Sequence, residues 1–127
     1  MERSRDWMMQ AEVDLEHARK DLNDGFYEWA CFSAQQSAEK AVKALFNALN
    51  SEAYGRNIAG LLKRLPLKVP EELIEKAKEL DKFYLGPRYP NMHAEGIPHE
   101  HYTKAEAERA ISYAEEIIKF CKSNFPK

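Results

Sequence analysis

The sequence predicts an all-α fold, an up-and-down bundle of about five helices with a long loop before the last helix. Apolar residues recur at steps of three and four through most of the 127 residues, which is the spacing of one helix face. Glycines and prolines divide these patterns into segments of helix length. The composition, 44% hydrophobic and 31% charged, is typical of a chain that buries a core. We therefore expect one domain over residues 1–127.

The first two expected helices are the longest. The first covers residues 5–23, with Ser4 as its expected cap and Gly25 just beyond its end, where glycine accepts the left-handed conformation. The second covers residues 26–50 without a proline or glycine and is rich in alanine. Small residues at helical spacing let neighbouring backbones approach closely, so we expect this to be the central helix.

Three further helices are expected, two of them shorter. Leucines and isoleucine over residues 58–65 predict a short third helix. A fourth begins at Pro70, because a proline in the first turn leaves no helical hydrogen bond unmade. The last helix follows Thr103, which forms a capping box with Glu106.

The chain contains no apolar stretch of the roughly 20 residues needed to cross a bilayer. Its first six residues also lack the apolar core of a signal peptide. We expect a cytoplasmic protein with no membrane association, in which Cys31 and Cys121 are buried reduced thiols without a disulfide.

The net charge of −2 excludes binding of nucleic acid through overall charge, so any such binding must be local. One acid-free stretch lies between Glu52 and Glu71. We interpret it as a solvated basic face. Its basic residues are Arg56, Lys63, Arg64 and Lys68.

The segment 85–102 is the strongest functional feature of the sequence. It is unusually long for a loop in a compact bundle, and such loops are often functional. It holds three of the four histidines, and we expect its tyrosines and prolines to anchor it. Its polar and titratable residues are Arg88, Tyr89, His93, Glu95, His99, Glu100 and His101.

Arg88 and His93 form a pair suited to phosphodiester chemistry. The arginine is able to hold a phosphate through paired N–H bonds, and the histidine titrates near neutrality and is able to move a proton. Pro90, between them, disfavours a continuous helix over the pair. A metal site is the alternative, with His99 and His101 as ligands beside His93 or Glu95.

Three parts of the sequence carry a resemblance to the HEPN domain family of small helical bundles. They are the run at 31–45, CFSAQQSAEKAVKAL, the Gly55-Arg-Asn-Ile58 junction, and the loop Tyr84-Leu-Gly-Pro-Arg-Tyr-Pro90 with its arginine-tyrosine-proline triplet. The likeness extends over most of the chain. It implies a bundle that often dimerises and is frequently encoded beside a minimal nucleotidyltransferase partner.

The resemblance also implies a site. Many family members resemble metal-independent ribonucleases that use an arginine and a histidine four to six residues apart, which Arg88 and His93 match. We expect these two as catalytic residues and Tyr84, Arg88, Tyr89 and Lys43 as ligand-binding residues, with no metal and no cofactor.

The sequence and the resemblance leave three functions open. The first is a HEPN module that binds a nucleotide or RNA phosphate and works with a nucleotidyltransferase. The second is a toxin-like ribonuclease that uses Arg88 and His93, and the third is a structural subunit that dimerises without catalysis.

Overall fold

The computed structural model describes residues 2–127, and all the regular secondary structure in this range is helical. The predicted all-α class is therefore confirmed. Between residues 2 and 127, no helix combines the length and the apolar character that a bilayer crossing requires. The elements are α1 (Ser4–Asn23), α2 (Tyr27–Ala48), α3 (Ile58–Arg64), α4 (Glu71–Asp81), the 3-10 turn η1 (Pro90–Met92), α5 (Pro98–His101) and α6 (Lys104–Ser123).

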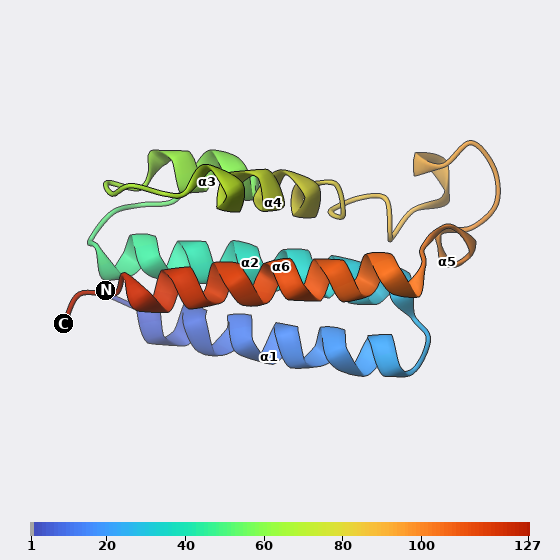
Figure 1. The fold of residues 1–127 in the computed structure, drawn as a ribbon, viewed down its shortest axis with the longest axis horizontal. Helices are drawn as coiled ribbons and strands as arrows, with labels where there is room; N and C mark the ends of the chain where they lie inside the picture. Colours follow the sequence, from blue (N-terminus) through green and yellow to red (C-terminus); the bar gives the residue numbers. More distant parts are fainter. Residues whose placement is uncertain (1) are drawn as a thin grey trace.

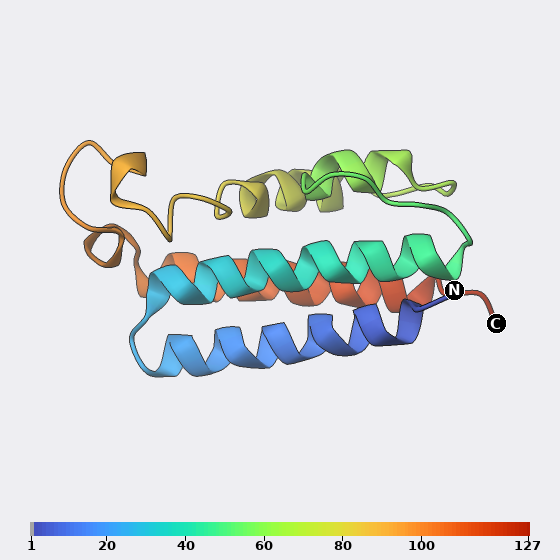
Figure 2. The same cartoon turned by 180° about the vertical axis from the view of Figure 1, so that it is seen from behind.

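The long helices form a bundle of four rods, one of which is the pair α3 and α4. Helices α2 and α6 run side by side in the same direction, with α1 on one side of them and the α3–α4 pair on the other (Figures 1 and 2). The short elements η1 and α5 lie at the end of the bundle opposite the chain termini (Figure 1). This end carries the loop that the sequence singles out.

Helix α2 is buried on several sides, as its composition predicts. Five of its alanines have no exposed surface, and they allow α1 and α6 to pack closely against it. Leu45 and Val42 on the same helix are also fully buried. These alanines are Ala30, Ala34, Ala38, Ala41 and Ala44.

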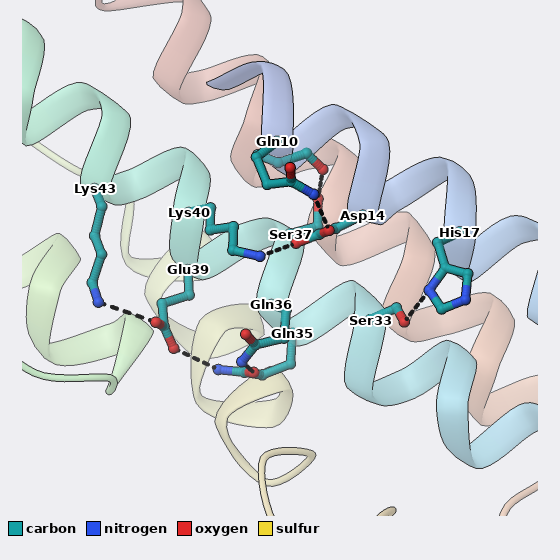
Figure 3. A network of polar contacts seen from close by, with 11 residues as sticks. Gln10, Asp14, His17, Ser33, Gln35, Gln36, Ser37, Glu39, Lys40 and Lys43 are labelled. Atoms are coloured by element: carbon teal, nitrogen blue, oxygen red, sulfur yellow. Dashed lines mark hydrogen bonds and ion pairs between the residues drawn. The ribbon is translucent and has the colours of Figure 1, made fainter. Parts of the chain in front are cut away.

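Polar side chains on α2 are buried but hydrogen-bonded. The Ser37 hydroxyl donates to the Ala11 carbonyl of α1 at 2.6 Å, and the Lys40 ammonium lies 2.6 Å from the Asp14 carboxylate (Figure 3). Gln35, which is fully buried, donates to Glu39 at 3.3 Å. A buried polar group costs little only when it has such partners, so these bonds also fix how α2 faces its neighbours.

The start of α3 is held by two side chains, one of them distant in sequence. Asn57 accepts the Gly60 N–H at 2.8 Å as the cap, and the Asp81 carboxylate accepts the N–H groups of Ile58 and Ala59 at 2.7 and 3.1 Å. Burial raises the pKa of Asp81 above its usual value, although these two bonds oppose the shift. The contact places the segment before α3 beside the end of α4.

Two predicted details of the helices are wrong. Ser4 is the first residue of α1 rather than its cap, and the Glu2 carboxylate accepts the Ser4 N–H at 2.5 Å instead. Helix α4 spans Glu71–Asp81, with Pro70 at the cap position rather than in the first turn. The predicted bundle with a long segment before the last helix is confirmed, and this segment contains η1 and α5, so α6 is the sixth α-helix within residues 2–127.

The two cysteines are free and buried, as predicted, and burial raises the pKa of each thiol to about 12. Thiolates are the reactive species, and an ordinary cysteine has a pKa of about 8.5. We expect both thiols of the native protein to resist Ellman's reagent at mildly alkaline pH. In the protein unfolded in guanidinium, two thiols per chain should react with the reagent. Labelling of the native protein at the unfolded rate would contradict the buried placement.

Candidate functional site

The loop between α4 and α6 is anchored at several points, in line with the sequence expectation. Pro87 is fully buried. The ring of Tyr102 packs edge-on against Phe83, with centroids 6.1 Å apart, and against His93 at 5.7 Å. Burial raises the pKa of the Tyr102 hydroxyl to about 12, so it stays protonated at neutral pH.

A histidine supplies one further anchor that the sequence did not predict. Nδ1 of His99, on α5, lies 3.0 Å from both carboxylate oxygens of Glu28 in the first turn of α2. Glu28 is only 5% exposed, so this contact satisfies a buried acid. The two residues are 71 positions apart, and only the folded chain brings them together.

Arg88 is held in a cage of aromatic rings. Its Nε donates to the Tyr84 carbonyl at 2.8 Å. Its guanidinium carbon lies 4.4 Å from the ring centroid of Phe32, 4.6 Å from that of Tyr84 and 5.1 Å from that of Tyr89. Within residues 2–127 it forms no ion pair, and its two terminal nitrogens make no hydrogen bond. These nitrogens therefore remain available to an anion.

A second arginine lies against the same cage. The guanidinium carbon of Arg56 is 5.1 Å from the Tyr84 ring centroid. The sequence places Arg56 in the acid-free stretch that predicts a solvated face, and nothing in the local pattern links it to Tyr84. The link depends on the Asp81 carboxylate, which holds the start of α3 beside the end of α4.

His93 has a defined orientation in the structure. Its Nε2 lies 2.8 Å from the Gly86 carbonyl oxygen, and because a carbonyl only accepts, this nitrogen carries the proton. Nδ1 is then the free basic nitrogen of the neutral ring. The ring stacks in parallel on His101 at 4.4 Å, and Nε2 of His101 donates to the Glu95 carbonyl at 2.6 Å.

Arg88 precedes η1 in the chain and His93 follows it, and the same turn supports both side chains. Tyr89 is extended before Pro90, so no continuous helix joins them, as Pro90 predicts. Both side chains bond to carbonyls of the turn at 84–87, Arg88 to Tyr84 and His93 to Gly86. The turn thus sets the position of both residues.

Lys43 is not part of this cluster. Its ammonium lies 3.1 Å from the Glu39 carboxylate and 5.8 Å from the centroid of Trp7 (Figure 3 shows the ion pair). It follows Phe32 by eleven positions on α2, which is roughly 16 Å along the helix axis. The structure brings together Tyr84, Arg88 and Tyr89 but leaves Lys43 elsewhere.

The histidines that the sequence offers as metal ligands contact other residues in the structure. His99 faces Glu28, whereas His101 stacks on His93. In the part of the chain that the structure describes, residues 2–127, no three His, Cys, Asp or Glu side chains are grouped in a way that would hold a metal ion.

Fold and site together define a small helical bundle that presents an arginine, aromatic rings and histidines at one end. The chain belongs to the HEPN family, since the model of the HEPN domain matches residues 4–124. It is 30% identical to a protein of Methanocaldococcus jannaschii named "Putative toxin MJ1304", over 91% of this chain and 84% of that protein.

Solved structures agree with this assignment. The crystal structure of TT1696 from Thermus thermophilus is 47% identical, with a TM-score of 0.94 over 97% of this chain and 98% of that chain. An archaeal HEPN homologue, ST0689, is 41% identical, with a TM-score of 0.86 over 99% and 100% of the two chains. A HEPN domain protein of Thermotoga maritima is 46% identical, with a TM-score of 0.76 over 92% and 94%.

Substitution of Gly86 tests how closely the turn at 84–87 packs against Tyr102. A Cβ at this position would lie 2.4 Å from the Tyr102 hydroxyl oxygen, so Tyr102 or the turn must move. We expect Gly86→Ala to lower the free energy of unfolding by about 1–3 kcal/mol, as overpacking does. Urea denaturation measures the change. In the matched control Gly60→Ala, inside α3, the nearest atom lies 3.4 Å from the new Cβ, and the gain in helix propensity should offset any crowding.

Proposed function

We propose that this protein binds the phosphate of a nucleotide or of RNA at Arg88. The observation that carries the proposal is the caged guanidinium without an acidic partner. A lone arginine on a surface usually pairs with a carboxylate or extends into water. Arg88 instead keeps its two terminal nitrogens unbonded while three rings and a carbonyl hold the rest of the group.

This arrangement favours an anion with two acceptor oxygens that face the two terminal nitrogens. Because the guanidinium is fixed before binding, little side-chain entropy is lost when a phosphate bonds to it. Tyr89 is 46% exposed beside the arginine and offers a ring on which a base is able to stack. Phosphate contact and base stacking together are the usual features of sequence-tolerant recognition of single strands.

Substitution of Arg88 tests the proposal. We expect Arg88→Gln to weaken binding of a fluorescent single-stranded RNA by about ten- to a hundredfold, the usual effect of losing hydrogen bonds to a charged group. Arg88→Lys should also bind more weakly, because an ammonium lacks the planar fork. Fluorescence anisotropy measures both affinities.

Arg5→Gln provides the matched control for this measurement. Arg5 is exposed on α1, and it forms no ion pair within residues 2–127. Helices α2 and α6 separate α1 from α3 and α4 (Figure 1). It should bind like the wild type. Wild-type affinity in Arg88→Gln would exclude Arg88 as the phosphate ligand and would favour the alternative of a structural subunit.

Metal-independent cleavage of RNA is the second candidate function. The orientation of His93 supports it, since Nδ1 is the nitrogen left free to take a proton from a ribose hydroxyl. Arg88 would stabilise the charge that develops on the phosphate. The relative named as a toxin gives this candidate further support.

A cleavage assay separates this candidate from binding alone. If the protein cleaves labelled single-stranded RNA, the activity should persist with chelator, because the step needs only proton transfer and charge stabilisation. His93 would take the proton of the 2′-hydroxyl as its oxygen bonds to the phosphorus, and would return a proton to the 5′-oxygen as the bond from phosphorus to that oxygen breaks, leaving a 2′,3′-cyclic phosphate. His93→Ala and Arg88→Ala should each lower the rate by about a hundredfold or more. Circular dichroism checks that each variant remains folded. An undiminished rate in His93→Ala would rule out the catalytic role.

Partners of this protein also belong to the proposal. We propose a homodimer, which the exposed apolar side chains of Phe26, Trp29 and Leu85 support. A minimal nucleotidyltransferase is the proposed protein partner, and a relative named as a toxin agrees with the presence of some partner. A cytoplasmic location remains an expectation from the sequence.

A further inference from the structure

Three arginines and three tyrosines lie in the segments that surround α3 and follow α4, and contacts at Tyr84 and at the Tyr54 carbonyl link them in two groups. The guanidinium carbons of Arg56 and Arg88 lie 5.1 and 4.6 Å from the same Tyr84 ring centroid, so they are at most about 10 Å apart. Arg64 donates from a terminal nitrogen to the Tyr54 carbonyl at 2.7 Å, two residues before Arg56. We call this the arginine–tyrosine row: Arg64, Tyr54, Arg56, Tyr84, Arg88 and Tyr89.

The row carries positive charge that the protein does not neutralise. Within residues 2–127, none of its three arginines forms an ion pair, whereas Arg3, Arg19 and Arg109 each pair with a carboxylate. The chain has no acidic residue over 53–70 or 82–94, and these are the two segments that meet at Tyr84. Two carboxylates approach these segments, Glu52 at the Tyr54 hydroxyl and Asp81 at the start of α3, and within residues 2–127 neither forms an ion pair with the three arginines.

Tyrosine rings lie close to the arginines on this surface. Tyr54 is 71% exposed and Tyr89 is 46% exposed. The ring of Tyr84 contacts the guanidinium groups of both Arg56 and Arg88. The hydroxyl of Tyr54 donates to the Glu52 carboxylate, which holds the tyrosine by its tip and leaves its ring exposed. Exposed rings between cations are suited to bases and phosphates that alternate along a strand.

Interaction with the dipole of α3 does not account for the positions of Arg64 and Arg56. Arg64 is in the last turn of α3, where a cation interacts favourably with the helix dipole. Its guanidinium, however, bonds to Tyr54, which precedes α3 in the chain. Arg56 precedes the same helix and lies against Tyr84, so the dipole gives no reason for its position.

We infer that the arginine–tyrosine row is a binding track for single-stranded RNA, with phosphates on Arg88, Arg56 and Arg64 and bases on the exposed tyrosines. The inference rests on the proposed function and extends it from one phosphate to several. Three cations spread along a surface match phosphates that repeat along a strand better than the clustered phosphates of one nucleotide. Rings accept only unstacked bases, so a single strand is favoured over a duplex.

The test measures binding of a labelled single-stranded RNA of about a dozen nucleotides, within the length that such surfaces cover, by anisotropy at several salt concentrations. We expect Arg56→Gln and Arg64→Gln each to weaken binding by about three- to tenfold. Each should also reduce the slope of log K against log salt by about 0.7, the value for one lost phosphate contact on a single strand. Arg56→Lys, which keeps the charge, should restore the slope, and Arg5→Gln should change neither quantity.

The outcomes separate this inference from the proposed function. If Arg88→Gln weakens binding while Arg56→Gln and Arg64→Gln leave affinity and salt slope unchanged, the phosphate site stands and the track is excluded. Adenosine monophosphate carries a single phosphate. If it displaced the labelled strand at a concentration close to the dissociation constant of the strand, the track would also be overturned. Equal affinity for duplex RNA would overturn the role of the tyrosine rings.

Discussion

The burial of α2 is the constraint on which the rest of the structure depends. A helix that contacts α1, α6 and the α3–α4 pair has little room for large side chains at its closest contacts and cannot leave polar groups unpaired there. Alanine satisfies the first requirement and allows close approach of the neighbouring backbones. Hydrogen bonds from Ser37 and Gln35 satisfy the second, because an unpaired polar group at this depth would cost more than it contributes (Figure 3).

The same helix supports the candidate site at its N-terminal end. Phe32 projects one ring against the guanidinium of Arg88, and Glu28, one turn earlier, binds His99 of α5. The loop therefore rests on the most buried element of the fold at two points. An arginine supported in this way has already given up much of its side-chain freedom, which is the general condition for tight binding of a small anion.

The sequence predicts the helices well and the site only in part. The capping box of Thr103 and Glu106 forms as expected, because all its atoms lie within one turn. The features that could not be predicted, Asp81 at the start of α3 and Arg56 against Tyr84, depend on contacts between residues about 22 to 28 positions apart. Ser4 fails as a cap because α1 begins one residue earlier, with Arg3 at the cap position and the Ser4 N–H bonded to the Glu2 carboxylate, a local choice that the residue type alone does not decide.

The parallel arrangement of α2 and α6 has a consequence for how the chain folds. Contacts between α1 and α2, and between α3 and α4, join neighbours in sequence and close short loops, which is fast. The contact of α2 with α6 is different, because a loop of more than fifty residues must close before it forms. On the ribosome, the alanine surface of α2 that receives α6 therefore stays uncovered until the 20 residues of the last helix have emerged.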